Sequence, residues 1–169
     1  MRWFNKYVES PQNTISNIRG HEPDVRFYFG LGMNLKPKTI LELARDAGRI
    51  SLSLAEQRAR SGFSVVGLDN EVSMLKEARC KARRFPKDTR RSIRLVRGDM
   101  RKWRWPEHLH LVLVRCASIT HLLELSDQLR VWRHAFENLR PSGSFAVDTT
   151  MPNFLAYADS FANKPRSDC

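Results

Sequence analysis

Short apolar runs alternate with longer amphipathic stretches along most of the chain. Apolar residues at successive positions, rather than at every second one, are typical of parallel strands that are buried on both faces. The amphipathic stretches repeat their apolar positions with the spacing of a helix. The pattern predicts strands at 39–43, 64–68, 93–96, 109–114 and 144–147, and helices at about 24–35, 48–60, 71–84, 125–139 and 154–162.

The stretch 125–139 has the clearest helical pattern in the chain. Its large apolar residues recur every three or four positions and form a single stripe. Pro141 and Gly143 follow it closely and are typical stop signals, so we expect the helix to end before them and a strand to begin at Ser144. The stripe consists of Leu125, Leu129, Trp132, Phe136 and Leu139.

Strands and helices alternate, and each crossover is long enough for the next strand to return parallel to the one before. The sequence therefore predicts an α/β fold of the three-layer Rossmann-like kind, an open parallel sheet with helices on both faces. Residues 1–23 are polar and irregular and are interpreted as an N-terminal arm. The domain spans 24–162, where Asp24 is expected to cap the first helix, and 163–169 form a tail.

Positive charge is concentrated in one segment. The formal net charge at pH 7 is +11, and residues 79–104 contain twelve Lys and Arg against Asp88 and Asp99, a net charge of +10. Such a cluster can attract a polyanion such as RNA, and the neighbouring Trp103 and Trp105 can stack on bases. The alternative is the solvated outer face of a helix and a loop, with tryptophans that are buried.

The composition is that of one soluble domain with a substantial core in 169 residues. No apolar run approaches the length that crosses a bilayer, and the first residues lack the apolar stretch of a secretion signal. We therefore expect a cytoplasmic protein without membrane contact. Cys80, Cys116 and Cys169 are widely spaced and include no CxxC pair, so we expect reduced thiols and no metal site.

Two carboxylates follow successive predicted strands. Ligands of open parallel sheets bind beyond the carboxyl ends of the strands. Asp69 ends the second strand, where it can accept hydrogen bonds from both hydroxyls of a ribose, and Asp99 follows the third, where it can accept from an exocyclic amine. A single carboxylate at a strand end is often only a helix cap or a turn former. Two of them at the exits of successive strands favour a nucleotide site.

Four segments carry longer motifs, each at a strand exit or a helix start. They read LELARDAGR at 41–49, VVGLDNEVSML at 65–75, LVRGDM at 95–100 and HLLELSDQL at 121–129. In this order they resemble the class I methyltransferases that use S-adenosylmethionine, a group whose motifs read roughly LELGCGTGR, VVGLD.S..ML, L..GDM and HLL...DQL. The similarity extends over about residues 24–154.

This resemblance implies S-adenosylmethionine as the cofactor and assigns the parts of its site. The loop 42–48 would lie under the methionine moiety, and Asp69 would bind the ribose hydroxyls. Asp99 and Met100 would hold the adenine edge, and the segment 115–118 would flank the methyl group. The implied cofactor-binding residues are Glu42, Ala44, Asp46, Gly48, Asp69, Asn70, Met74, Asp99, Met100 and Arg115.

The resemblance also places His121 near the substrate, as a weak candidate for a general base acting on an unidentified methyl acceptor. The alternative is a histidine at a helix start or in the core. Methyl transfer is an in-line displacement that depends on alignment and a desolvated site more than on proton transfer. A missing catalytic dyad therefore does not argue against the reaction.

The glycine-rich loop of the family is altered in this chain. Aligned on Gly48, the first two family glycines fall on Ala44 and Asp46. Asp46 adds a negative charge where the carboxylate of the cofactor would lie, which costs on the order of 1–4 kcal/mol at surface-like dielectric. This corresponds to about tenfold to nearly a thousandfold weaker binding. Pairing of a carboxylate with Arg45 or Arg49 would offset the cost.

The family also continues beyond the fifth strand with another helix and an antiparallel pair of strands, whereas this chain ends at Cys169. The expected fold is therefore truncated after the fifth strand. That strand would be an exposed edge, which favours association. Either the protein is a truncated or decayed relative, or a partner chain supplies the missing part.

Three functions remain open from the sequence. The first is a methyltransferase, active or weakened. The second is a non-catalytic module of the same fold that binds RNA or another polyanion through the cluster 79–104. The third, a nicotinamide-dependent enzyme, is disfavoured because the Gly-x-Gly-x-x-Gly motif is absent.

Overall fold

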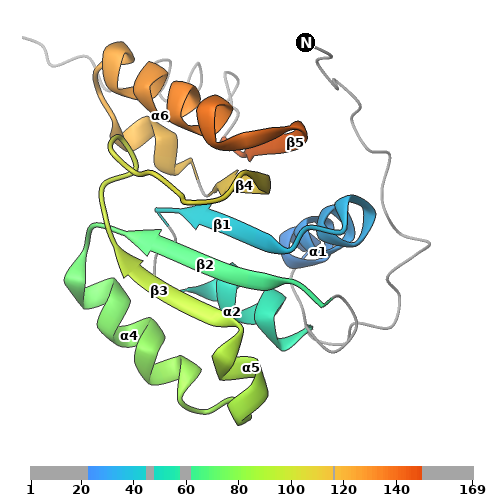
Figure 1. Cartoon of the computed structure of the whole chain (residues 1–169). Helices are drawn as coiled ribbons and strands as arrows, with labels where there is room; N and C mark the ends of the chain where they lie inside the picture. The colour runs from blue at the N-terminus through green and yellow to red at the C-terminus, as the bar shows by residue number, and fades with distance from the viewer. Residues whose placement is uncertain (1–22, 45–47, 58–61, 116, 150–169) are drawn as a thin grey trace, which may run out of the picture.

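The computed structural model describes residues 23–44, 48–57, 62–115 and 117–149, and its centre is one five-stranded sheet (Figure 1). The strand order is β3-β2-β1-β4-β5, and every neighbouring pair is parallel. The predicted α/β fold with an open parallel sheet is confirmed. The strands are β1 Thr39–Leu43, β2 Ser64–Asp69, β3 Ile93–Arg97, β4 Leu109–Val114 and β5 Leu139–Val147.

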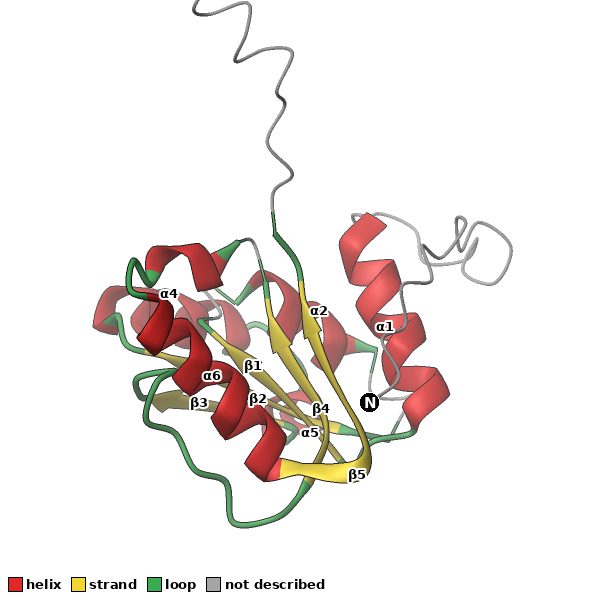
Figure 2. Cartoon of the chain, turned by 90° about the horizontal axis from the view of Figure 1, so that it is seen from above, coloured by secondary structure: helices red, strands yellow, loops and turns green. Residues whose placement is uncertain are grey.

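Helices cover both faces of this sheet. Helices α1 and α2 lie on one face and α6 lies on the other (Figure 2). Helices α4 and α5 lie beside β3, at one edge (Figure 1). The bounds are α1 Pro23–Leu35, α2 Arg49–Glu56, α4 Val72–Ala82, α5 Lys87–Arg91 and α6 Leu125–Asn138, with a 3-10 turn, η1, at Ser118–His121.

The core has two parts because successive side chains of a strand point to opposite faces. Ile40 of β1 contributes to the cluster under α1 and α2, whereas its neighbour Leu41 contributes to the cluster under α6. The second cluster also contains Trp103, which is 4% exposed. The alternative that this tryptophan is buried is therefore confirmed.

The boundaries of β5 differ from the prediction. The strand begins at Leu139, directly after α6, and includes Pro141 and Gly143 rather than starting at Ser144. Between Leu139, opposite Leu109, and Ser144, opposite Leu111, the register shifts. In the described sheet β5 pairs only with β4, and an edge strand tolerates a proline that cannot donate to a ladder.

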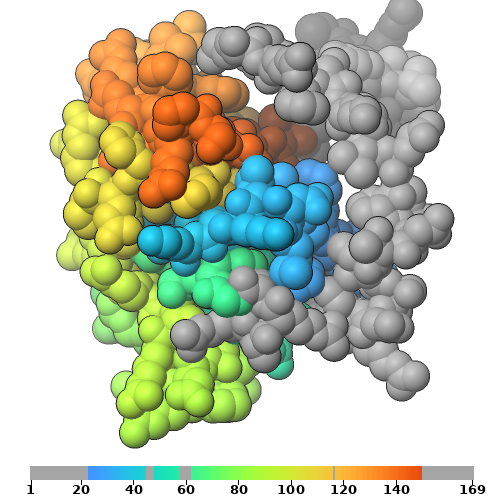
Figure 3. Space-filling view, turned by 45° about the vertical axis from the view of Figure 1, so that its right-hand side comes forward, coloured from blue at the N-terminus to red at the C-terminus, as the bar shows by residue number. Residues whose placement is uncertain are grey.

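Helix α6 is confirmed, but its apolar stripe does not face the sheet. The side chains that it buries are Val131, Ala135 and Asn138. Trp132 is 41% exposed and contacts Phe145 of β5 edge-on, with ring centroids 5.0 Å apart. The stripe therefore lies at the surface, where Figure 3 shows α6 (orange). The exposed members are Leu125, Leu129, Trp132 and Phe136.

The start of α1 also differs from the prediction. The helix begins at Pro23, whose fixed φ suits a first helical position, so Asp24 lies inside the first turn and is not its cap. The rest of the predicted arm, the helix 154–162 and the tail lie outside the described residues. No helix in the described part of the chain is both long enough and apolar enough to traverse a bilayer.

Candidate functional site

The exits of the first four strands meet at one edge of the sheet, because these strands are parallel neighbours. The backbone NH of Gly98, after β3, donates to the carbonyl of Asp69 over 3.0 Å. On the other side of β1, the hydroxyl of Ser118 lies 3.4 Å from the carbonyl of Ala44. Asp69 and Asp99 thus lie at the same edge, on neighbouring strands, as the sequence predicts. We call this edge the carboxyl edge.

The turn after β1 has an unusual backbone. Ala44 has φ +50° and Gly48 has φ +82°, both in the left-handed region that glycine adopts most readily. Gly48 is buried and directly precedes α2. An alanine therefore holds the conformation for which the family uses glycine, at a cost of about 1 kcal/mol. Asp46 lies outside the described residues.

The carboxylate of Asp69 is largely buried, with 9% of the residue exposed. One of its oxygens accepts a hydrogen bond from the backbone NH of Glu71 over 2.8 Å. This bond holds the carboxylate at the strand end, just before α4. Asn70 beside it is exposed, and Met74 in the first turn of α4 is half-buried. Their contacts with an adenosine stay a prediction.

Asp99 is held by Arg101, a residue that the sequence analysis did not single out. The Arg101 guanidinium donates to both carboxylate oxygens, over 2.6–3.0 Å, and its backbone NH donates to one of them over 2.8 Å. This pairing lowers the pKa of Asp99 below its usual value. Arg101 also donates to Asp127 of α6 over 2.7 Å, so α6 is tied to the carboxyl edge. Met100 packs against the core under α6.

Arg115, at the exit of β4, is the centre of a buried ion network. Only 4% of its side chain is exposed, and it donates to Glu42 over 3.3 Å and to Asp24 over 3.0 Å. Its guanidinium also lies over the ring of Tyr28, 5.2 Å from the centroid. Opposite charges that satisfy one another are the condition for burying an ion at acceptable cost. Arg115 thus joins α1, β1 and β4 at the carboxyl edge.

Glu42 is fixed from the other side by α2. The backbone NH of Ser51 donates to its carboxylate over 3.0 Å, and the Ser51 hydroxyl donates to the same oxygen. Glu42 is 1% exposed. Its contact with the cofactor stays a prediction; the bonds described here make it a positioning residue for Arg115.

The side chain of Asp24 pairs with Arg49, both of whose terminal nitrogens donate to the carboxylate. This interaction lowers the pKa of Asp24. From the sequence, Arg49 is a possible partner for a carboxylate in the altered loop. In the structure its guanidinium pairs with the first turn of α1.

Asp148 follows β5 and was not singled out from the sequence. It accepts from the Tyr28 hydroxyl over 2.7 Å and from the backbone NH of Ala117 over 3.2 Å. Burial and the adjacent carboxylate raise the pKa of Tyr28 above its ordinary value. The strand-exit rule that identified Asp69 applies equally to Asp148, so the signal was present in the sequence.

His121 ends the 3-10 turn and is exposed, so it is not a core histidine. The turn begins after Ala117, a second alanine with positive φ, at +53°. His121 therefore follows the exit of β4 on a short turn of the chain, and its role as a base stays a prediction. Cys116, within the segment that would flank the methyl group, lies outside the described residues.

The carboxyl edge therefore offers carboxylate acceptors at two strand exits and, after β1, two residues with a left-handed backbone. Such a set can orient a polar ligand that carries hydroxyl and amino donors. Asp69 and Asp99 supply the acceptors, and the network around Arg115 keeps the exits of β1 and β4 in place.

Comparison with protein families agrees with this arrangement. The model described as "Methyltransferase domain" matches residues 40–143, more than half of the chain. The matched region begins in β1 and ends within β5, so it includes all four strand exits that form the carboxyl edge. Among curated proteins, none matches significantly.

Solved structures share the fold. The glycopeptide N-methyltransferase MtfA complexed with sinefungin is 25% identical, with a TM-score of 0.68 over 77% of this chain and 50% of its own. The CcbJ methyltransferase from Streptomyces caelestis is 27% identical, with a TM-score of 0.64 over 76% of this chain and 49% of its own. The present chain thus spans about half the length of the structures that it matches.

Proposed function

Since this chain belongs to the methyltransferase-domain family, we propose that it transfers a methyl group from S-adenosylmethionine to a nucleophilic acceptor. The observation that carries the proposal is the position of Asp69 and Asp99 at the exits of neighbouring parallel strands, linked through the backbone of Gly98. Similar structures were solved with S-adenosylmethionine, its demethylated product or sinefungin, which supports the same cofactor here.

In this proposal Asp69 accepts from the ribose hydroxyls, and Asp99 accepts from the adenine amine. The residues fit these tasks because both carboxylates are held by hydrogen bonds before any ligand arrives. Ala44 and Gly48 would lie beside the methionine end of the cofactor, where their left-handed backbone allows close approach. Asn70, Met74 and Met100 would complete the adenosine contacts, a role that stays a prediction.

The bound cofactor supplies a sulfonium carbon that an acceptor displaces in line. The chain's own task is to align and desolvate the site, because such a displacement gains most from orientation. The network of Glu42, Arg115 and Asp24 serves this task by fixing two strand exits. His121, exposed after the β4 exit, is the candidate to accept a proton from the acceptor.

Calorimetric titration with S-adenosylmethionine tests the proposal. We expect a saturable heat for the whole chain, and Asp69→Ala should weaken binding by about 10- to 100-fold, because it removes charge-assisted hydrogen bonds. The matched control is Asp88→Ala on α5, whose side chain is 86% exposed and far from the carboxyl edge. Absence of binding at about 1 mM ligand, or an equal loss in both variants, would contradict the proposal.

We further infer that Asp46 weakens cofactor binding without abolishing it. In the alignment on Gly48, Asp46 takes the position of a family glycine, and the family resemblance implies that the cofactor's carboxylate lies nearby, so the two negative charges would repel each other. Asp46→Gly should tighten binding by about tenfold to a thousandfold, measured by the same titration. The control is Ala44→Gly, which changes the backbone preference of the same turn without changing its charge. Equal affinities of Asp46→Gly and the wild type would refute the inference.

A further inference from the structure

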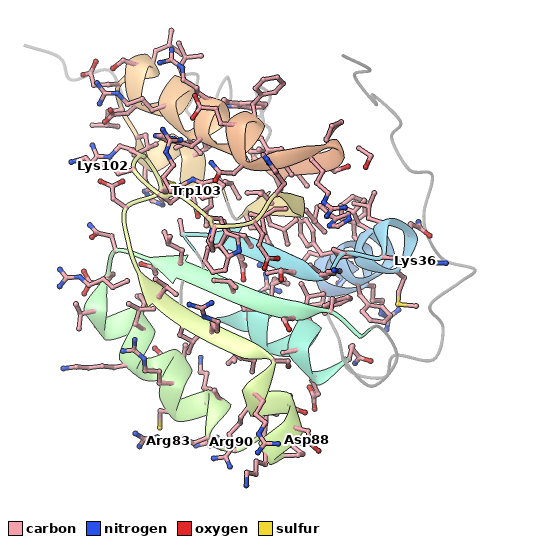
Figure 4. All side chains as sticks on the ribbon, viewed as in Figure 1. Lys36, Arg83, Asp88, Arg90, Lys102 and Trp103 are labelled. Atoms are coloured by element: carbon pink, nitrogen blue, oxygen red, sulfur yellow. The ribbon has the colours of Figure 1, made fainter. Side chains whose placement is uncertain are left out.

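A basic hollow lies at the opposite end of the sheet from the carboxyl edge. It has a volume of about 330 Å³ and is bounded by the last turn of α4, by α5 and by the first half of β3. Figure 4 shows Arg83 and Arg90 together beside α4 and α5, away from Lys102 and Trp103 of the β3–β4 loop. The residues that line the hollow are Arg79, Ala82, Arg83, Arg90, Ile93 and Leu95.

The lining combines an apolar floor with a cationic rim. Ala82, Ile93 and Leu95 form the floor, and none of the described residues that line the hollow is a carboxylate. Arg79 donates to the backbone carbonyl of Leu95 over 3.2 Å, so this guanidinium is anchored on the outer strand β3. Arg83 and Arg90 are exposed at the rim.

The acidic residues of this region are engaged on its flanks. Glu77 pairs with Lys81 over 2.7 Å, and Asp88 lies 3.6 Å from Arg91. Positive charge also continues beyond the hollow, at the exposed side chains Arg84 and Lys87. The surface can therefore meet more than one anionic group of an extended ligand.

We propose that this hollow binds single-stranded nucleic acid, with phosphates at Arg83 and Arg90 and a base over the apolar floor. Guanidinium groups match phosphate oxygens in a bidentate manner, which lysine does not do. The volume lies at the lower end of the range for small-ligand sites and fits a group of the size of a base. A strand that alternates phosphates with flat apolar faces fits a floor and rim of this kind, and in a duplex the bases are not free to enter.

The test is fluorescence anisotropy with a short labelled single-stranded RNA and the whole chain, at several salt concentrations. Arg83→Ser/Arg90→Ser should weaken binding by about tenfold or more and reduce the slope of log K against log salt by about 1.4, since each lost phosphate contact contributes about 0.7. The matched control is Arg133→Ser/Arg140→Ser on α6 and β5. It removes the same charge beside the outer strand β5, on the opposite side of the sheet from β3, and should retain most of the affinity.

Three results would overturn the proposal. Equal losses in the two double variants would show attraction by net charge alone. Equal affinity for a duplex would contradict a base on the floor. A polyglutamate peptide that binds as tightly as the RNA, and loses affinity with the same variant, would make the hollow a site for acidic peptides.

Arg83→Lys/Arg90→Lys keeps the charge, so it should keep the salt slope and lose part of the affinity. Circular dichroism confirms that each variant is folded.

Discussion

The two faces of the sheet are covered in different ways. Most apolar side chains of α1 and α2 point inward, and Leu54 of α2 and Val25 of α1 are at most 2% exposed. On the other face, α6 buries Val131 and Ala135 and leaves larger side chains at the surface, with Phe136 76% exposed. One sheet thus carries a face whose helices bury most of their apolar side chains and a face whose helix leaves its largest apolar side chains exposed to solvent.

The two faces differ in which segment supplies the large buried side chains. On the α6 face the β3–β4 loop contributes Trp103, which shares a buried cluster with Val131 and Ala135. Because the loop fills this space, the helix approaches with small residues. On the α1–α2 face the helices fill the space themselves, and they also supply Asp24 to the ion network. Helical spacing therefore predicts a helix but does not determine which side of the helix meets the sheet.

The largest effect on the free energy of unfolding is expected in the ion network of the face under α1 and α2. Glu42→Ala leaves Arg115 buried with less compensation and opens a cavity, so it should lower the free energy of unfolding by about 3–5 kcal/mol. The matched control is Glu77→Ala on α4, whose surface pair with Lys81 is worth less than about 1 kcal/mol. Urea denaturation measures both, and equal costs would show that the network does not stabilise the fold.

Truncation of an apolar side chain should also lower the free energy of unfolding by different amounts on the two faces. Leu54→Ala in α2 should cost about 2–5 kcal/mol, because the side chain is fully buried. Leu129→Ala in the α6 stripe, where 53% of the residue is exposed, should cost less than about 1 kcal/mol. Urea denaturation of the pair is a direct comparison of the faces. A cost for Leu129→Ala as large as that for Leu54→Ala would mean that the stripe is covered in solution.

Acid should remove the stabilisation that the Asp24–Arg49 pair gives to the α1–α2 face. Arg49 lowers the pKa of Asp24 in the folded state. The ion pair therefore contributes to the free energy of unfolding above the unfolded-state pKa of about 3.9, and this contribution is lost as the pH falls through the folded-state pKa. Asp24→Asn lacks the contribution at every pH, so the urea midpoints of variant and wild type should converge below about pH 4. A gap that stays constant through this range would contradict the role of the ion pair.

The smallest effect on stability is expected at the outer side of α6. Phe136→Lys should change the free energy of unfolding by less than about 0.5 kcal/mol, because the side chain makes few buried contacts. It should reduce concentration-dependent self-association in light scattering, since an exposed apolar patch beside the edge strand β5 favours contact between copies. Arg133→Lys on the same helix is the control; association unchanged in both variants would contradict this role of the stripe.

Much of the candidate site was predictable, because strand exits are visible in the sequence. Asp69 and Asp99 were placed by the rule that parallel strands end at one edge, and the structure brings them to that edge. Asp148 follows the same rule at β5 and was overlooked. Arg101 was not predictable in the same way, because its bonds to Asp99 and Asp127 depend on where α6 lies.

The sequence by itself determined the order of strands and helices, the parallel sheet and the carboxylates at its edge, because local spacing and crossover length restrict these strongly. Only the tertiary structure decided which side of α6 is buried, that a proline lies within β5, and that residues 24, 42 and 115 form one network. These features depend on contacts between segments far apart in the chain, where available volume and charge compensation outweigh local preference.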